Sequence, residues 1–209
     1  MRLFIAGASG RTGRLLTLLA LDRGHSVTAL VRDPAGLGTA DERLGVVTGD
    51  VLEPQGWSDA VAGHDAVVTL LAPRPRRDGR VYIDGTRNLA DAAADAGVRR
   101  FVAVSAEGAG VAARKLPLGY RLVRRIPVVA RLYPDIAEME HVLMARDDLD
   151  WTVVRAAILT NGPASGAYRV TPGDVVAHGL RVSRADLAAF LLVLLETGAH
   201  VRERVALAD

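Results

Sequence analysis

Seven consecutive residues near the N-terminus have the types and spacing of a phosphate-binding turn: Gly7, Ala8, Ser9, Gly10, Arg11, Thr12 and Gly13. The glycines allow a tight turn and let backbone N–H groups approach a pyrophosphate at the start of a helix. Hydroxyls of Ser9 and Thr12 can bond phosphate oxygens. Arg11 can add charge near a 2′-phosphate, or stay solvated in the first turn of the helix. The pattern predicts a dinucleotide site.

The elements around this turn make the prediction specific. Glycine is 21 of the 209 residues, so the spacing alone could also mark a plain glycine turn. An apolar run at 3–6 predicts a buried strand directly before it, and the leucines of 15–19 predict a helix that begins near Arg11. A strand, a glycine turn and a helix in this order are typical of dinucleotide binding.

Strand and helix patterns alternate along the rest of the chain. Apolar runs predict strands at 27–31, 44–48, 66–71, 101–105 and 151–154, with helices at 55–62, 82–96 and 134–146. Continuous apolar strands separated by helices predict an α/β fold, a Rossmann-type doubly wound parallel sheet covered on both faces. Ligands of such sheets lie beyond the carboxyl ends of the strands, so the residues after each strand are the candidate site.

The C-terminal part, about 156–209, predicts a small substrate-side region of the same domain. Short strands are expected at 167–170 and 174–177 around a turn at 171–173, and an edge strand is expected at 204–208. Ser183, with Asp186 three residues later, predicts the N-cap of a further helix. No linker divides the chain, so we expect one domain over 1–209.

Arg32 stands 19 residues after Gly13, at the end of the second expected strand. An acidic residue there would bond the ribose hydroxyls of NAD(H), whereas an arginine can hold a 2′-phosphate. The alternative is a surface pair with Asp33. The residue type favours NADP(H) over NAD(H).

Composition sets the broad class of the protein. The formal net charge is +2, too balanced to imply nucleic acid, and there is no cysteine, which excludes thiolate catalysis and cysteine metal sites. The five histidines are scattered, so no metal site is expected. The first expected strand occupies the N-terminus and the apolar runs are too short to span a membrane. We expect a soluble cytoplasmic protein, either a monomer or a weak homodimer.

An ordered set of motifs resembles the atypical short-chain dehydrogenases/reductases, in the NAD(P)H-binding (NmrA-like) group with the flavin reductase (biliverdin-IXβ reductase) family. The resemblance covers nearly the whole chain. Its carriers, besides the glycine turn, are residues 30–33, 49–52, 61–67, 85–88, 149–155, 166–168 and 183–187.

The resemblance implies roles for residues that follow the third, fourth and fifth strands. Asp50 and Val51 correspond to a pair that brackets adenine, although Asp50 could instead be a strand-end residue that caps the helix region expected from Gln55. Leu71, Ala72 and Arg74 lie beside the expected ribose and pyrophosphate, and Arg74 aligns with a cofactor-contacting arginine; the alternative is a solvated loop. Ser105 stands where the superfamily has its catalytic Ser or Thr, on the nicotinamide side.

The usual proton donor of the superfamily is missing from this chain. The pair is Tyr-x-x-x-Lys, but the single lysine is Lys115, and the residue four positions before it is Val111. Glu138 and His141 share a face of the helix expected at 134–146 and could donate a proton; the alternative is a solvated helix face. Reduction of a flavin or quinone needs no such acid, because the cofactor supplies the hydride and water the proton.

A basic segment at about 108–134 follows the fifth strand and should lie over the nicotinamide end of the site. It could be a lid that attracts an anionic substrate, a surface for an acidic partner or an anionic membrane, or an amphipathic cover helix with solvated arginines.

The motifs together predict an NADPH-dependent reductase that transfers hydride to a flavin-like or quinone-like small molecule, which would be anionic if the basic segment is a lid. Two alternatives remain open. A non-catalytic NADP(H)-binding sensor, with the basic segment as its partner surface, would suit the missing Tyr-Lys pair. A sugar-nucleotide epimerase-like enzyme is disfavoured by the short C-terminal part.

Overall fold

A computed structural model of the protein describes residues 1–72, 80–110, 118–123, 125–173 and 175–209. An eight-stranded sheet runs through its centre in the order β3-β2-β1-β4-β5-β6-β10-β8, and every neighbouring pair is parallel except β10 and β8. The strands are β1 (Arg2–Ala6), β2 (Ser26–Val31), β3 (Leu44–Thr48), β4 (Ala66–Thr69), β5 (Arg100–Ala106), β6 (Asp150–Ala156), β8 (Arg169–Pro172) and β10 (Glu203–Ala208).

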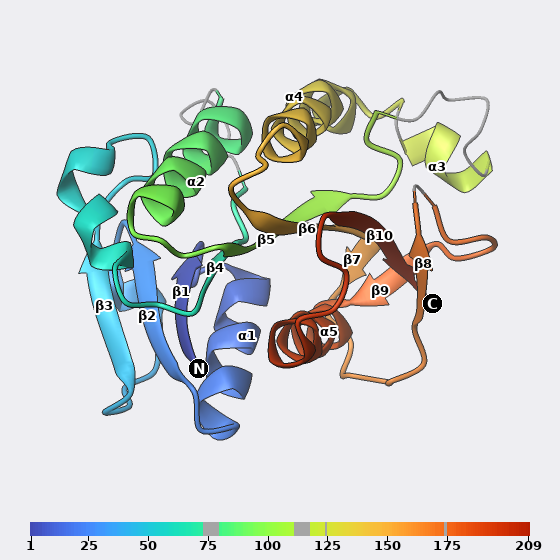
Figure 1. The fold of residues 1–209 in the computed structure, drawn as a ribbon. Coiled ribbons are helices and arrows are strands. Elements are labelled where there is room, and N and C mark those ends of the chain that lie inside the picture. Colours follow the sequence, from blue (N-terminus) through green and yellow to red (C-terminus); the bar gives the residue numbers. More distant parts are fainter. Residues whose placement is uncertain (73–79, 111–117, 124, 174) are drawn as a thin grey trace.

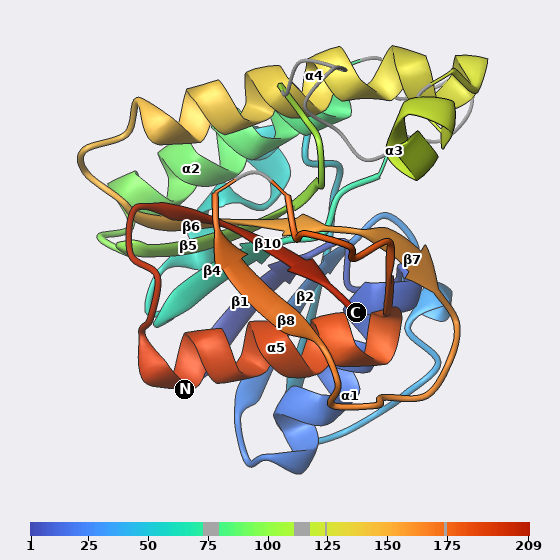
Figure 2. The same ribbon diagram turned by 90° about the vertical axis from the view of Figure 1, so that its right-hand side faces the viewer.

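Helices cover both faces of this sheet. Helices α1 (Arg11–Asp22) and α5 (Arg184–Thr197) pack together on one face, and α2 (Thr86–Asp95) and α4 (Pro127–Met144) lie on the other (Figures 1 and 2). The short α3 (Leu118–Val123) precedes α4. Four further short turns of helix are η1 (Pro34–Gly36), η2 (Pro54–Gly56), η3 (Ser58–Val61) and η4 (Val81–Gly85). The prediction of a doubly wound α/β fold is confirmed.

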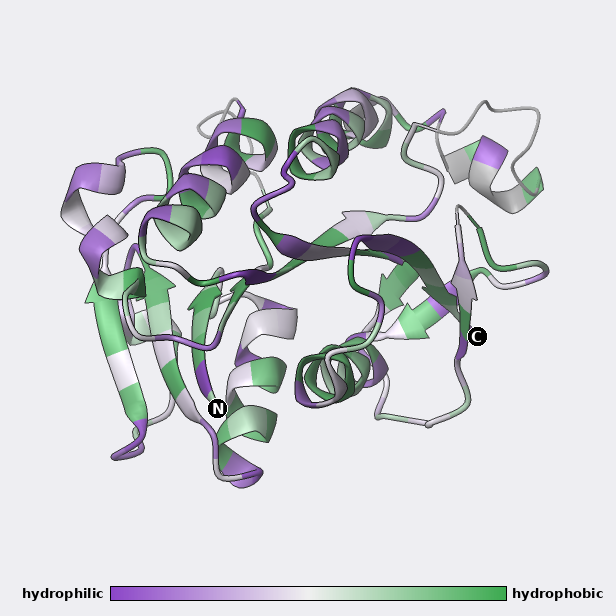
Figure 3. Ribbon diagram, viewed as in Figure 1, coloured by the Kyte–Doolittle hydropathy of each residue, from purple (hydrophilic) through white to green (hydrophobic). Residues whose placement is uncertain are grey.

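Side chains alternate in direction along each strand, and this divides the hydrophobic core into two halves, one on each face of the sheet. In β1, Leu3 and Ile5 pack toward α1 and α5, whereas Phe4 and Ala6 pack toward α2 and α4; all four side chains are fully buried. Successive strand residues point to opposite faces, so a strand covered on both sides must be apolar throughout. Figure 3 shows the result as hydrophobic central strands, with hydrophilic residues mainly in loops and on outer turns.

The strand order reverses at β1, and this reversal defines where a ligand can enter. The chain passes from β1 to β2 and β3 on one side, and β4 then returns to the other side of β1. The connections after β1 and β4 therefore leave in opposite directions and open a crevice at the carboxyl ends of these strands. Gly7 follows β1 and Leu70 follows β4, so both lie at this crevice.

Several expected elements differ in the structure. Residues 204–208 form a strand as predicted, but β10 lies inside the sheet between β6 and β8, so its residues from Val205 to Ala208 are fully buried. Strand β8 continues through Thr171 and Pro172, where a turn was expected. Residues 175–177 form no strand. The helix expected at 134–146 begins at Pro127, a residue that suits the first helical turn, and Pro134 lies in its interior.

A second sheet of two short parallel strands was not predicted. It pairs β7 (Ile158–Thr160) with β9 (Arg181–Ser183) and lies in the C-terminal part, beside α5 (Figure 2). The pairing places residues that follow β6 directly beside the N-terminus of α5. Both segments therefore border the same end of the molecule as the glycine turn.

Candidate functional site

The glycine turn between β1 and α1 requires glycine at its two outer positions. Gly7 has φ +86°, and a Cβ on it would lie 2.6 Å from the Leu70 carbonyl oxygen. A Cβ on Gly13 would lie 2.2 Å from the Gly7 carbonyl oxygen. The backbone is thus packed too closely for any side chain at either position.

The N-terminus of α1 has the features of an anion-binding position. Gly10 is its N-cap, no side chain caps the first turn, and no acidic residue lies in that turn. The Gly10 N–H donates to the Gly7 carbonyl at 3.0 Å, which closes the turn and directs the first helical N–H groups outward. Uncapped N–H groups and the positive end of the helix dipole favour a phosphate at this position.

Two cavities meet at this turn and share Gly10, Leu70, Leu71 and Ala72 as a common wall. The smaller cavity, about 380 Å³, extends toward β2 and β3. The larger one, about 610 Å³, extends toward β5, β6 and α4. They adjoin at the switch point between β1 and β4 and lie side by side along the carboxyl edge of the sheet, and we refer to the pair as the trough.

The smaller cavity contains the residues expected at the adenosine end of a cofactor: Gly7, Ser9, Arg32, Asp50 and Val51. The backbone of 50–51 is held in place from two sides. The indole of Trp57 donates to the Asp50 carbonyl at 2.7 Å, and the Asn88 amide donates to the Val51 carbonyl at 2.8 Å. Arg32 is exposed at the rim. The structure therefore brings these expected residues together.

The larger cavity contains Arg11, Thr12, Gly13 and Ser105 from the expected set. Arg11 lines this cavity and Arg32 lines the smaller one, and the expected role of Arg11 near a 2′-phosphate stays a prediction. Arg74, the remaining cofactor candidate, lies outside the described residues.

Ser105 is held by a buried ion pair at the floor of the larger cavity. Its hydroxyl donates to Glu140 Oε1 at 2.5 Å, and Arg155 donates to the same carboxylate through Nε at 2.9 Å and Nη2 at 2.5 Å. Glu140 and Arg155 are 2% and 1% exposed. Arg204 Nη1 is a more distant partner of Glu140, at 3.8 Å.

Sheet register explains why these three groups meet. Ser105 of β5 and Arg155 of β6 are register partners on adjacent parallel strands, so their side chains leave the same face of the sheet. Helix α4 covers that face and contributes Glu140. The sequence held one signal for this ion pair, which is Arg155 within the apolar strand 150–156. A guanidinium buried there requires a carboxylate partner.

The two residues of α4 that were expected as proton donors, Glu138 and His141, face solvent. Glu138 and His141 form a pair at 3.7 Å with side chains 56% and 69% exposed, and neither lines a cavity. An α-helix turns about 100° per residue, so position 140 lies on the opposite side from position 138. The inward carboxylate of α4 is therefore Glu140, and we do not retain Glu138 or His141 as catalytic candidates.

Two tyrosines, Tyr82 and Tyr133, line the larger cavity, although neither has a lysine four positions later. Tyr133 donates its hydroxyl to the Glu107 carbonyl at 3.2 Å. Burial, with a smaller contribution from the charge of Asp135, raises the pKa of Tyr82 to about 12. Tyr82 therefore stays a neutral hydrogen-bond donor throughout the physiological range.

Arg184 is a further residue of the larger cavity that had no expected role. It is the first residue of α5, and its guanidinium donates to the Asn161 side-chain oxygen at 2.7 Å and the Leu159 carbonyl at 3.3 Å. By contrast, Arg121, Arg125 and Arg131 of the basic segment are exposed and line neither cavity. That segment contributes apolar residues of α4 to the cavity wall, among them Val129 and Leu132.

The part of the chain that the structure describes has neither a cluster of metal ligands nor a helix that could span a membrane. Its residues include no cluster of three or more potential metal ligands. Among the described helices, none has both the length and the apolar character needed to cross a membrane.

Comparison with known proteins points to one family. A family model described as NAD(P)H-binding matches residues 7–197. The chain is 32% identical over 224 residues to an uncharacterised chloroplast protein of Arabidopsis thaliana, across 100% of this chain and 78% of that protein. It is 35% identical over 187 residues to the 3-diazoavenalumate denitrifying reductase of a Streptomyces species, across 81% of this chain and 59% of the reductase. Two further relatives are much longer, and the chain spans 31% and 34% of their lengths.

A solved structure shares the fold over the full length of the chain. A candidate NADH-flavin reductase from Streptococcus pneumoniae superposes with a TM-score of 0.81, at 22% identity, covering 100% of this chain and 99% of that one. At this identity the likeness bears on the fold alone.

Proposed function

The chain belongs to the NAD(P)H-binding family of atypical short-chain dehydrogenases/reductases, and on this premise we propose that it is an NADPH-dependent reductase of a flavin-like or quinone-like acceptor. The observation that carries the proposal is the pair of adjoining cavities that make up the trough. One end has the residue types that hold a dinucleotide, and the other is a larger, mainly apolar chamber next to Ser105.

The cofactor would lie along the trough with its diphosphate at the N-terminus of α1. Gly7, Gly10 and Gly13 leave room for this group, and Ser9 and Thr12 supply hydroxyls. Arg32 would bind the 2′-phosphate at the rim, and the braced backbone of Asp50 and Val51 would border the adenine. Leu71 and Ala72, in the common wall, would border the central part.

The chamber suits an acceptor with a flat apolar body. Its walls are formed by aliphatic side chains of β5, β6, β7 and α4, and polar groups are few: Thr12, Tyr82, Ser105, Tyr133 and the two arginines. A reduced nicotinamide supplies a hydride when bound. The protein would then hold the acceptor at the right distance from the nicotinamide, and solvent water would supply the proton, so that no acid of the protein is needed.

Ser105 would act here as a hydrogen-bond acceptor. Its proton points to Glu140, so the lone pairs of its oxygen are the part available to a ligand. An amide or ring N–H of the cofactor or the acceptor is the natural donor. Tyr82 has the complementary property, because its neutral phenol can donate to an oxygen of the acceptor.

The test is NADPH oxidation in the presence of acceptors. Purified protein is mixed with NADPH and FMN, riboflavin or a soluble quinone, and the absorbance of reduced nicotinamide is followed. We expect acceptor-dependent oxidation with at least one of these compounds. Tight NADPH binding without oxidation across the panel would contradict catalysis.

The second candidate is a non-catalytic NADP(H) sensor. The observation in its favour is that Ser105 donates its hydrogen bond to Glu140 and that Glu138 and His141 lie outside the chamber, so neither of the expected proton donors faces the acceptor. The same acceptor panel separates the two functions.

A further inference from the structure

Two positively charged side chains line one side of the larger cavity. Arg11 is the first residue of α1 and Arg184 is the first residue of α5, and these helices pack against each other on the same face of the sheet (Figure 1). Both residues line the larger cavity and neither lines the smaller one. The two guanidiniums therefore belong to the chamber side of the trough.

Arg184 is anchored in a way that leaves its charge uncompensated. Its two hydrogen-bond acceptors, the Asn161 amide oxygen and the Leu159 carbonyl, are both neutral. Within the described ranges, no carboxylate lies within ion-pair distance of Arg184 or Arg11. Neutral anchors orient a guanidinium without neutralising it, which preserves its attraction for an incoming anion.

The two charges also act on each other. Burial lowers the pKa of Arg184, and the positive charge of Arg11 lowers it further. Like charges in a partly buried site are mutually unfavourable, and an anion between them would remove this penalty. The surrounding wall is apolar, so the two arginines are the principal polar feature on this side of the chamber.

We propose that Arg11 and Arg184 form an anion subsite of the acceptor chamber, and that the acceptor carries a phosphate or carboxylate group in addition to its reducible ring. This inference rests on the proposed reductase function and specifies its substrate class. Arg184 is its main determinant, because Arg11 is exposed and Arg184 is held in place. The charge selection expected from the basic segment is thereby assigned to two residues outside that segment.

Riboflavin and FMN provide a matched pair of acceptors, since they share the ring and differ by one phosphate. Steady-state oxidation of NADPH is measured with each, in the unmodified protein and in Arg184→Gln. We expect the KM for FMN to rise about tenfold or more in the variant, as for loss of a charge-assisted hydrogen bond. The KM values for riboflavin and for NADPH should stay within about twofold.

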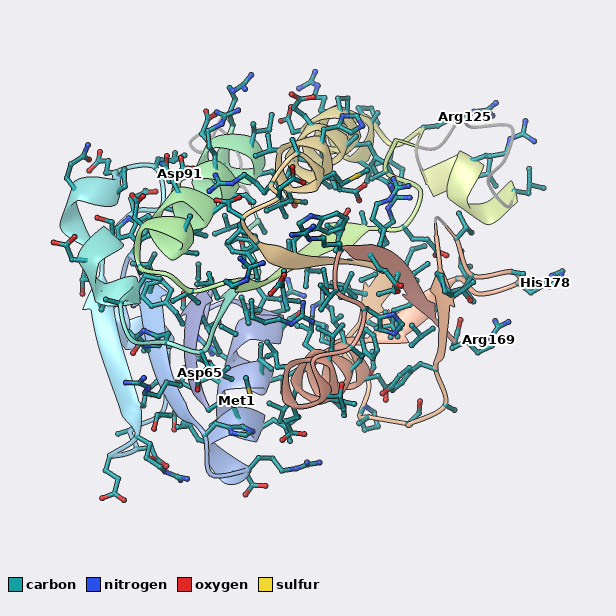
Figure 4. The ribbon with its side chains drawn as sticks, viewed as in Figure 1. Met1, Asp65, Asp91, Arg125, Arg169 and His178 are labelled. Atoms are coloured by element: carbon teal, nitrogen blue, oxygen red, sulfur yellow. The ribbon has the colours of Figure 1, made fainter. Side chains whose placement is uncertain are left out.

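The matched control is Arg125→Gln. This arginine is exposed on the outside of the turn between α3 and α4 (Figure 4) and lines neither cavity. It belongs to the basic segment, so its removal tests general attraction by surface charge. We expect unchanged KM values for both flavins. A loss of FMN affinity in Arg125→Gln equal to that in Arg184→Gln would assign the effect to overall charge.

A binding measurement separates failure of the subsite from failure of the reductase proposal. Quenching of flavin fluorescence gives the dissociation constants of FMN and riboflavin on protein saturated with NADP⁺, without any turnover. Tighter binding of FMN in the unmodified protein, lost in Arg184→Gln, supports the subsite even if neither flavin is reduced. Equal binding of the two flavins, or a variant that weakens only NADP⁺, overturns it.

Discussion

At the scale of single residues, the site combines groups whose properties are set by their neighbours. The Ser105 hydroxyl donates its hydrogen bond to Glu140, which leaves its lone pairs for a ligand, and Glu140 can be buried because Arg155 binds it through two nitrogens. Tyr82 is a donor because burial keeps its phenol neutral. Residue type alone states none of these roles, which is why the substitutions below test the environment together with the residue.

Arg32→Ala tests the choice between the two nicotinamide cofactors. Loss of a guanidinium that binds the 2′-phosphate should weaken NADPH binding about tenfold to a hundredfold and leave NADH binding unchanged. Calorimetric titration of both nucleotides measures this. Arg14→Ala is the matched control, because Arg14 is exposed on α1 and lines neither cavity. Undiminished preference for NADPH in Arg32→Ala would refute the phosphate assignment.

Ser105→Ala tests the proposed acceptor role of this hydroxyl. The variant keeps the Glu140–Arg155 pair and removes one hydrogen-bond acceptor from the chamber. We expect kcat/KM for the acceptor to fall about tenfold, the worth of one hydrogen bond. Steady-state kinetics checks it against Ser58→Ala, a change in η3 outside both cavities. A rate equal to that of the unmodified protein would show that the hydroxyl contacts neither ligand.

Tyr82→Phe tests a hydrogen-bond donor, the Tyr82 phenol, which should stay protonated at every pH used in the assay. The raised pKa keeps the phenol protonated well above neutral pH, so removing it should lower the rate by the same factor at every pH from about 6 to 10. Parallel pH–rate profiles of the two proteins are the expected result. A loss of activity near pH 10 in the unmodified protein alone would mean that Tyr82 ionises much earlier than its burial implies.

At the scale of elements, Asp186 joins the start of α5 to the loop that follows β7. Its backbone N–H donates to the Ser183 hydroxyl at 2.9 Å, and that hydroxyl donates back to the carboxylate at 2.8 Å. The same carboxylate accepts from the Ser165 and Gly166 N–H groups at 2.9 and 2.8 Å. The N-cap predicted from the spacing of Ser183 and Asp186 is confirmed, and the contacts to the loop come in addition.

Asp186→Asn tests this junction through its pH dependence. Burial opposes ionisation, but the hydrogen bonds from Gly166, Ser183 and Ser165 outweigh it and lower the pKa. A depressed carboxyl pKa stabilises the fold above the unfolded value of about 4, and the stabilisation is lost as the pH falls through the folded value. We expect the variant to lose about 1–3 kcal/mol of unfolding free energy at pH 7 and much less near pH 3.

Urea unfolding at the two pH values measures this difference. Asp95→Asn is the control, because Asp95 is exposed at the end of α2, and its effect should be below about 0.5 kcal/mol. A destabilisation by Asp186→Asn that is the same at pH 7 and pH 3 would show that the charge of Asp186 makes no contribution.

At the scale of the whole molecule, the site exists only when the sheet is assembled. Its walls come from the ends of β1, β4, β5 and β6 and from α1, α4 and α5, so residues from every third of the chain meet there. The switch point between β1 and β4 opens the crevice, and the C-terminal strand β10 supports β6 from the other side. Ligand binding should therefore stabilise the global fold.

Nucleotide-dependent stability tests this coupling. A ligand that binds only the folded state at a hundred times its Kd adds about 2.7 kcal/mol to the free energy of unfolding. We expect NADP⁺ at that excess to produce this shift in urea unfolding, and NAD⁺ at the same concentration to produce a smaller one. No shift with either nucleotide would contradict the binding site itself.

Local features of this protein were predictable from consecutive residues. The glycine turn depends on steric limits within seven residues, and alternating apolar runs and helices require a parallel sheet with two covered faces. The helix cap at Ser183 likewise depends on a short spacing, because its partner Asp186 lies three positions later. These parts of the fold follow from neighbours in the chain, so sequence alone determined them.

Only the tertiary structure decided what meets across long separations. Register between β5 and β6 places Ser105 beside Arg155, helix phase selects Glu140 over Glu138, and the packing of α1 against α5 brings Arg11 and Arg184 to one cavity. Strand β10 lies inside the sheet because β8 covers it, a pairing with no local signal. These contacts depend on how surfaces pack in three dimensions, and no spacing along one segment records that packing.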